Sequence, residues 1–480
     1  MTARATGRRM RPRLERVALC AAIALASVTA CGAPPVVVTP PLVAPQWQHA
    51  RDAAGGRRDT TWWRGFGDWR LDSLVTLARV ASTDLAAASG RLAAAEAALQ
   101  RTRGSLAPQA TARTNATRSR QVIGTFGALD LDVLGATLDA SWELDLTGRL
   151  RADRRASLAE LRAAGYDVVD VRRTITGRVV RGWHDVVGLA ARHRATTAAV
   201  AMLEETLALV SARARAGVAS PIDVEGAAAA VAETRASLPQ LHADLVDAVG
   251  ALAVLAATDV ATVTALLDGA TLGRALPDVP DAGVPADLLR ARPDVRRAEW
   301  RVQAAAARVT SARAALRPSF SLAGSVGVNR TNGVGAGIFS VGPSLALPFL
   351  DPAARARVVE RRAEVLQADA AWRGAVIAAA RDVEVAFARA RDESERLNTL
   401  GMALRRRAVV DTLAQVRWRA GRTDFRDVLE ARRACLDAEE AWVRQRVAVA
   451  QAVAAMHVAL GDPDAGPVAM TTTAPSAGRP

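Results

Sequence analysis

Lysine is absent from this 480-residue chain, so all 63 basic residues are arginine. We attribute this bias to a GC-rich genome and draw no function from it. The net charge of +14 does not indicate nucleic acid either. Six arginines and one glutamate in the first thirty residues contribute +5, and the remaining +9 is spread among acidic residues, as on a solvated surface. We therefore expect no nucleic-acid partner.

Motifs for catalysis and metal binding are missing as well. The chain has no glycine-rich phosphate loop, no zinc motif and no cysteine–histidine pairing. The histidines show no ligand spacing; they are His49, His184, His193, His242 and His457. We expect neither an enzyme nor a metal site, and no cofactor apart from a covalent lipid.

Long apolar runs are confined to the N-terminus. Beyond it, we find no run of the ~18 apolar residues that a membrane-spanning helix needs. If this protein crosses a membrane, we expect it to do so with strands.

The N-terminal segment has the pattern of a lipoprotein signal peptide, residues 1–30. A stretch with six arginines precedes the apolar run "VALCAAIALASVTA", and small residues stand just before Cys31. This resembles a bacterial lipobox, in which Cys31 becomes the lipidated first residue of the mature chain. Gly32 follows in place of the aspartate that signals inner-membrane retention, so the outer membrane is the expected location. Residues 31–60 are a tether rich in Pro, Val and Gly.

Only one other cysteine remains in the mature chain. Cys20 leaves with the signal peptide, and Cys435 lies in an Ala-rich helical stretch. We expect no disulfide, and Cys435 to be a small packed residue.

The body of the chain shows one order of elements twice. In residues 61–257 a helical pattern over about 68–105 precedes alternating residues that predict a β-hairpin. Long helices follow. The boundaries are a hairpin at about 109–147 and helices at about 149–216 and 221–255.

A linker, residues 258–285, separates this half from the second, residues 286–461. The second half has the same plan, with a hairpin at about 319–350 and helices at about 352–420 and 424–460. The tail, 462–480, has the composition of a disordered segment. The stretch 90–108 also matches 300–318, which indicates an internal duplication into two structural repeats.

Four strands per chain cannot close a membrane barrel alone. Strands persist in lipid only when closed, and membrane barrels start at about eight strands. The chain must therefore oligomerise. The first long helix would extend about 100 Å, which also implies a coiled-coil or helical-tube setting.

Six motifs in order carry a resemblance to a known family. They are "SWELDLTGRLR" (141–151), "RAGVASPIDV" (215–224), "RPDVRRAEWRV" (292–302), "LRPSFSLAGSVG" (316–327), "GPSLALPFLD" (342–351) and "RAGRTDFRDVLEARR" (419–433). Together they resemble the outer membrane factor family of tripartite efflux systems, of the TolC/OprM type, in its NodT-like lipoprotein branch.

The resemblance implies a mainly α fold with β. Three copies would form an outer-membrane β-barrel with four strands per chain and twelve in total, continued by a long periplasmic α-helical barrel. Its implied partners are two further copies, a periplasmic adaptor protein, an inner-membrane pump of RND type and outer membrane lipid.

Two similar turns end the long helices, about 100 Å of helix away from the hairpins. Gly217 and Gly421 are expected just past the helix ends, where glycine tolerates the left-handed conformation. Ser220 and Pro221 suit the first two positions of the next helix, and Asp424 suits the start of its counterpart.

Charged residues flank both turns. Arg215 and Arg419 are candidates to contact an adaptor, and equally suit the C-terminal ends of helices. Asp223 and Asp427 suit a first helical turn. By resemblance, Asp427 and Glu430 match the family's periplasmic aperture, where rings of carboxylates favour cations.

The resemblance also implies a closed-state latch from Asp223 to Trp418 and Arg422. The sequence departs from the family pattern here. Trp418 stands where tyrosine is common, so a hydroxyl bond is lost. Thr423 stands at the arginine position, with Arg422 beside it.

The function implied is a passive exit duct for small molecules or drugs, gated at its periplasmic end. A duct for type I protein secretion or for metal ions is an alternative, although the six methionines form no cluster. A coiled-coil scaffold without a pore is a more remote one, because it has no use for the hairpins.

Overall fold

The computed structural model describes residues 47–48, 61–122, 124, 128–273, 292–348 and 350–461. The predicted signal peptide, Cys31, most of the tether and the tail lie outside these residues.

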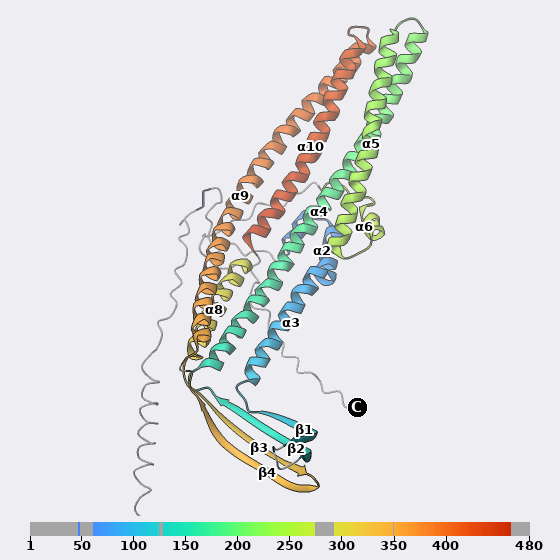
Figure 1. Ribbon diagram of the computed structural model, residues 1–480. Helices are drawn as coiled ribbons and strands as arrows, with labels where there is room; N and C mark the ends of the chain where they lie inside the picture. The colour runs from blue at the N-terminus through green and yellow to red at the C-terminus, as the bar shows by residue number, and fades with distance from the viewer. Residues whose placement is uncertain are drawn as a thin grey trace, which may run out of the picture. The chain divides into compact units, whose positions relative to one another are not determined.

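Helices dominate the described chain (Figure 1). The helices before the linker are η1 (Trp62–Phe66), α2 (Trp69–Ala81), α3 (Thr83–Gly104), α4 (Arg149–Arg215), α5 (Pro221–Ala256) and α6 (Val260–Leu267). Those after it are α8 (Pro293–Ala314), α9 (Pro352–Arg419) and α10 (Phe425–Leu460). The strands are β1 (Gln109–Val122), β2 (Ala128–Leu144), β3 (Ser319–Thr331) and β4 (Val334–Ala346).

The helical pattern expected over 68–105 is interrupted. Ser82 has ψ of 130°, outside the helical region, and separates α2 from α3. Its carbonyl accepts from Ala86 N at 3.0 Å, so Ser82 begins the second helix. The linker expected from 258 likewise contains a helix, α6, which Asp259 caps by accepting from Thr262 N at 2.6 Å.

Two glycines of α4, Gly177 and Gly188, mark close approaches to α10. A Cβ placed on Gly177 would overlap Val458, and one placed on Gly188 would overlap Val447. Gly177 and Gly188 are eleven residues apart on α4, and Val447 and Val458 are eleven residues apart on α10, which is about three turns in each helix. Their absent side chains allow the two helices to pack closely.

Two helices pass a test of length and composition for a membrane span, although neither contains an unbroken run of 18 apolar residues. Among the described residues, α4 and α5 each contain an 18-residue window that passes that test. The reason is their content of Ala, Val and Leu with few charges. Length and composition alone do not place a helix in a membrane.

The strands form one antiparallel sheet in the order β1-β2-β3-β4. Its pairs include Ala116 with Leu134 and Val326 with Leu138. Asn332 and Gly333 connect β3 to β4, with φ of 48° and 89°. This is the Asn-Gly hairpin turn that requires two positive φ values.

The two faces of the sheet differ in chemistry. Because side chains alternate along a strand, the register assigns each residue to a face. One face carries Leu134, Leu138, Trp142, Leu322, Val326, Val328, Phe339, Val341 and Leu345. The other carries Thr111, Asn115, Thr117, Thr137, Asp139, Ser141, Ser321, Ser325, Asn329, Ser340 and Ser344.

The described residues pack as two compact units that do not follow the two predicted repeats. One unit holds the sheet, with the described residues of Ala93–Ala163 and of Ala298–Trp372. The other holds the described residues of Pro41–Leu92, of Ala164–Arg297 and of Arg373–Pro480. Each unit therefore takes segments from both halves of the sequence.

We predict opposite effects for alanine at two glycines of α4. Gly188→Ala should destabilise the protein by about 1–3 kcal/mol, because its methyl group overlaps Val447. Gly165→Ala should stabilise it by up to about 1 kcal/mol, because nothing lies within 4 Å of the new Cβ and alanine favours helix. Thermal unfolding of the detergent-solubilised protein measures both, and equal shifts would contradict the close packing of α4 on α10.

Candidate functional site

The turns between α4 and α5 and between α9 and α10 have the glycine geometry expected from the sequence. Gly217 has φ of 76° and Gly421 has φ of 70°. In the second turn, Arg422 N donates to Arg417 O at 2.9 Å, as in a Schellman cap. Both positions require a residue that tolerates the left-handed conformation.

The helix that follows each turn begins differently. Ser220 caps α5 with Pro221 as its first residue, and Asp223 completes a capping box by accepting from Ser220 N at 3.1 Å. Asp424 is at the N-cap of α10, but its side chain accepts no capping bond. The first helix start is thus more firmly hydrogen-bonded than the second.

An apolar cluster joins the ends of the two helix pairs. Trp418 of α9 and Phe425 of α10 are both buried, with ring centroids 5.3 Å apart. The cluster consists of Val210, Ala227, Trp418, Phe425 and Val428. Because it takes residues from all four helices, both turns are held in one packed end.

Arg213 of α4 is a residue that the sequence reasoning missed. Its guanidinium lies 4.4 Å from the centroid of the Trp418 ring, a cation–π contact between the two helix pairs. Tryptophan is the aromatic residue that favours such a contact most. No local pattern marks it, because Arg213 and Trp418 are distant in sequence.

The two candidate aperture residues are exposed beside the second turn. Asp427 and Glu430 lie on the first turns of α10, three residues apart, and both are exposed. Asp427 also accepts a hydrogen bond from the Thr423 hydroxyl. Glu430 has no recorded partner within the described part of the chain. The carboxylates are therefore available to solvent from one face of the helix.

The three candidate latch residues make other contacts in the single chain. Asp223 closes its own capping box, Trp418 is buried in the apolar cluster, and Arg422 is exposed. Among the described residues, no hydrogen bond or ion pair joins Asp223 to Trp418 or Arg422. The latch remains a prediction. Arg215 and Arg419, the last residues of their helices, are both exposed as well.

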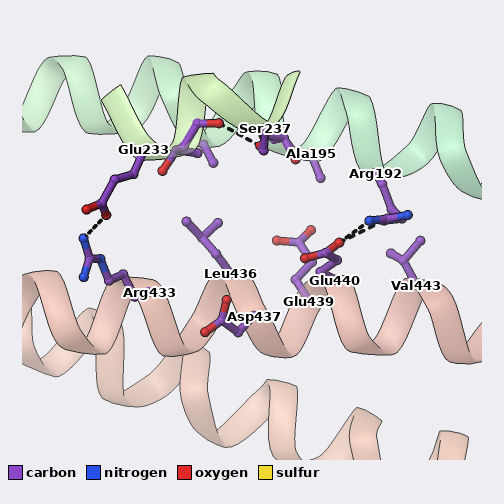
Figure 2. Close-up of a pocket in the computed structure, with 13 residues that line it drawn as sticks. Arg192, Ala195, Glu233, Ser237, Arg433, Leu436, Asp437, Glu439, Glu440 and Val443 are labelled. Carbon is purple, nitrogen blue, oxygen red and sulfur yellow. Dashed lines mark hydrogen bonds and ion pairs between the residues drawn. The ribbon is translucent and has the colours of Figure 1, made fainter. Parts of the chain in front are cut away.

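A charged pocket lies farther along these helices, lined by α4, α5 and α10 (Figure 2). It encloses about 320 Å³. Arg192 of α4 donates from Nε to Glu440 of α10 at 3.0 Å, and Arg433 of α10 pairs with Glu233 of α5. Burial alone would raise the pKa of Glu440, but bonds from Arg192 and Arg444 hold it below its usual range. These ion pairs therefore connect the two helix pairs along the wall of the pocket.

Neither metal nor disulfide chemistry is evident in the described residues. They contain no group of three His, Cys, Asp or Glu side chains that could hold a metal ion. Cys435 is a free thiol, partly buried. Burial, followed by the charge of Asp411, raises the pKa of this thiol. It is therefore a poor nucleophile.

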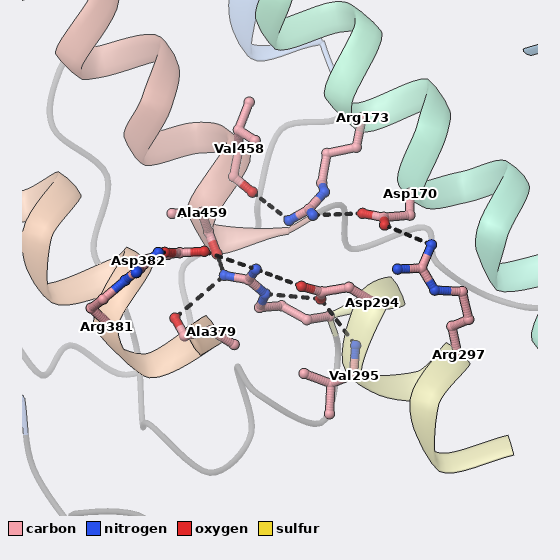
Figure 3. Close-up of polar contacts among 11 residues, drawn as sticks. Asp170, Arg173, Asp294, Val295, Arg297, Ala379, Arg381, Asp382, Val458 and Ala459 are labelled. Atoms are coloured by element: carbon pink, nitrogen blue, oxygen red, sulfur yellow. Dashed lines mark hydrogen bonds and ion pairs between the residues drawn. The ribbon is translucent and has the colours of Figure 1, made fainter. Parts of the chain in front are cut away.

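A buried arginine, Arg292, connects the start of α8 to α9 and α10. Figure 3 labels its partners Asp294, Ala379 and Ala459. Arg292, only 3% exposed, donates to Ala459 O at 2.9 Å and to Ala379 O at 3.3 Å. It also forms a two-pronged ion pair with Asp294, at 3.0 and 2.7 Å. Burial would raise the pKa of Asp294, but the Arg292 guanidinium lowers it below its usual range.

Arg173 of α4 completes this network. It donates to Val458 O at 2.6 Å, so two arginines, Arg173 and Arg292, bind carbonyls at the C-terminus of α10. Cations at this end of a helix stabilise its dipole. The end of α10 remote from the turns is thus fixed to α4, α8 and α9.

We predict that Arg292→Met destabilises the protein by about 3–5 kcal/mol, because it removes the cationic partner of the Asp294 carboxylate and the donor to Ala459 O at the C-terminus of α10. The matched control is Arg391→Met, which breaks an ion pair with Asp392 whose side chains are 67% and 64% exposed. That variant should change stability by less than about 0.5 kcal/mol. Chemical denaturation in detergent compares the two, and similar losses would contradict the role of Arg292.

Comparison with known proteins identifies the family. The model of the family described as "Outer membrane efflux protein" matches residues 74–258 and 284–462. The chain is similar to the pyoverdine export outer membrane protein OpmQ of Pseudomonas aeruginosa, with 31% identity over 90% of this chain and 94% of that protein. It is also similar to Nodulation protein T of Rhizobium leguminosarum bv. viciae, with 28% identity over 80% of each.

A solved structure of the outer-membrane channel OprN matches with a TM-score of 0.80 and 30% identity, over 90% of this chain and 99% of that one. These matches confirm the family indicated by the six sequence motifs, and with it the outer membrane location. The chain belongs to the outer membrane efflux protein family, and it is an outer membrane channel for efflux.

Proposed function

We propose that three copies of this chain form one continuous duct, with a closed barrel of twelve strands in the outer membrane. The four-stranded sheet carries this proposal. In the described structure, β1 and β4 are its two outer strands, and each lacks a partner on one side. Unpaired backbone groups are costly in lipid, so β1 of one copy must pair with β4 of the next.

The two faces of the sheet suit an inside and an outside. A barrel wall needs apolar side chains toward lipid and polar ones toward a water-filled lumen. The face with Leu138 and Phe339 meets the first need, and the face with Thr137 and Ser325 meets the second. Trp142 sits at the helical end of the apolar face, and its indole donates to Leu106 O at 3.0 Å. This suits the aromatic girdle at a membrane border.

The paired turns would form the periplasmic entrance of the duct. Three chains with two turns each would place six turns around one rim. Asp427 and Glu430 would then recur as rings of three carboxylates, which attract cations and repel anions. Arg215, Gly217, Ser220, Pro221, Arg419, Gly421 and Asp424 would shape the rim that an adaptor contacts. Asp223, Trp418 and Arg422 would hold it closed through contacts between copies.

The proposed duct also gives a place to the lipid anchor, the duplicated segments and the partner proteins. A lipid on Cys31 would anchor the tether, residues 31–60, in the outer membrane. The internal duplication would supply each copy with two hairpins and two helix pairs, as the two matched segments of the family model support. A periplasmic adaptor would connect the rim to an inner-membrane pump, which we propose to be of RND type.

Small molecules are the cargo class that the relatives support. Their names specify pyoverdine export for OpmQ and toluene efflux for TtgF of Pseudomonas putida, the latter 26% identical. Because such different compounds are exported by similar chains, we assign the choice of cargo to the pump upstream. This arrangement is favoured over a secreted protein as cargo, for which no relative named here provides support.

The test is single-channel conductance of the mature protein in a planar bilayer. The wild type should give discrete cation-selective steps. Removing both carboxylates in Asp427→Ala, Glu430→Ala should reduce the preference for cations or enlarge the steps, because the two rings of the entrance together lose six charges.

The control carries the same change elsewhere on a helix. Asp392→Ala, Glu395→Ala removes an exposed Asp and Glu at the same spacing within α9. It should leave selectivity close to that of the wild type. Equal effects of the two double variants would reject the aperture but retain the duct, whereas a folded wild-type trimer without any steps would indicate a sealed rim or a scaffold without a pore.

A further inference from the structure

The apolar face of the sheet ends in a charged band near the hairpin tips. On β2, every residue assigned to this face from Leu134 to Leu144 is apolar, a stretch of eleven residues. About 9–11 tilted residues cross the hydrocarbon core of a membrane. The strand has 17 residues. Its first part, which contains Asp130 and Asp132, therefore extends beyond the hydrocarbon core.

The direction of this extension follows from the chain connections. The sheet ends at Gln109, Leu144, Ser319 and Ala346 all lead into the helices α3, α4, α8 and α9. The opposite ends are the two hairpin turns. In an outer membrane channel the helices extend into the periplasm, so the hairpin tips reach the outer leaflet.

Three arginines project from the lipid side of this outer region. Arg118 Nε lies 3.4 Å from Asp132, and Arg120 Nε lies 3.8 Å from Asp130. Arg330 of β3 is exposed opposite Leu134, at the border of the apolar stretch; its Nε donates to Gly333 O at 3.1 Å, and it has no ion-pair partner among the described residues.

The two ion pairs leave their arginines open to another ligand. The side chains of Arg118 and Arg120 are 80% and 71% exposed. Pairs this exposed contribute little stability. Each arginine outside the hydrocarbon core keeps a planar guanidinium that matches two oxygens of one phosphate group. Buried at the bilayer midplane, each would instead cost about 2–4 kcal/mol.

We propose that Arg118, Arg120 and Arg330 bind the phosphate groups of glycolipid headgroups in the outer leaflet. This inference rests on the proposed barrel, because it requires the apolar face to meet lipid. Three copies would present nine arginines around the outer rim. They outnumber the six aspartates of the same band, so the rim attracts anionic headgroups by charge as well as by geometry.

The opposite face supplies a matched control. Arg113 belongs to the same strand, β1, and pairs with Asp139 at 3.6 Å. Its side chain is 72% exposed, comparable to that of Arg120. The register places it on the polar face, toward the lumen. Replacing it changes the charge of the strand without changing the surface that faces lipid.

The experiment measures the affinity of the delipidated, detergent-solubilised full-length protein for diphosphorylated lipid A. The variant Arg118→Gln, Arg120→Gln, Arg330→Gln should bind about a hundredfold more weakly, since each arginine near an anionic surface contributes to binding. Arg113→Gln should bind within about twofold of the wild type. Dephosphorylated lipid A should bind the wild type as weakly as diphosphorylated lipid A binds the triple variant, and added salt should weaken wild-type binding.

Two outcomes would overturn the proposal while leaving the duct intact. One is wild-type affinity in a triple variant that still conducts. The other is equal wild-type binding of phosphorylated and dephosphorylated lipid, which would assign recognition to the acyl chains. Wild-type protein that neither conducts nor binds lipid A would instead reject the barrel itself.

Discussion

The unpaired edges of the sheet are the constraint on which the rest of this structure depends. β1 and β4 each present one row of backbone groups that the described chain leaves without a partner. Water could satisfy these groups in a soluble protein, but lipid cannot. The apolar side chains around Leu138 and Phe339 suit lipid, and in lipid no water is present to hydrogen-bond the edge strands. Pairing between copies, as in the proposed trimer, would satisfy these backbone groups in lipid, and a single chain would then be an incomplete unit of function.

The long helices are held together by close packing and by largely buried arginines, since their backbone groups are already paired within each helix. Glycines at 177 and 188 let α4 approach α10, and Arg292 with Arg173 binds the C-terminus of α10. At the opposite end of α10, by contrast, exposed carboxylates follow a turn with a weakly bonded helix start. The two ends of α10 therefore differ: two arginines bind its C-terminus, whereas its N-terminus packs in the apolar cluster around Trp418 and presents exposed carboxylates.

Much of this architecture could be predicted from the sequence because local signals mark it. Glycine after each long helix and Ser220-Pro221 set the turns, and observed long-helix bounds differ from the predicted ones by about one residue. The Asn332-Gly333 turn carries an equally local signal, because Asn-Gly favours the two positive φ values of a tight hairpin turn. The Arg213–Trp418 contact and the bonds of Arg292 to Ala379 and Ala459 depend on packing between distant segments, which no local pattern contains. The break at Ser82 and the bond from Thr423 to Asp427 are local, because serine favours the N-cap and Thr423 lies four residues before Asp427.

The most direct test of the central claim is disulfide crosslinking between the outer strands of neighbouring copies. Each variant would carry two cysteines in a Cys435→Ser background, one at Ala116 of β1 and one at a single position of β4 between Ile338 and Gly342. Oxidation of the membrane-inserted protein should produce covalent dimers and trimers and nothing larger, because three copies close the ring. A ladder that ends at two copies or continues past three, or inserted protein that never crosslinks at any β4 position, would contradict the account.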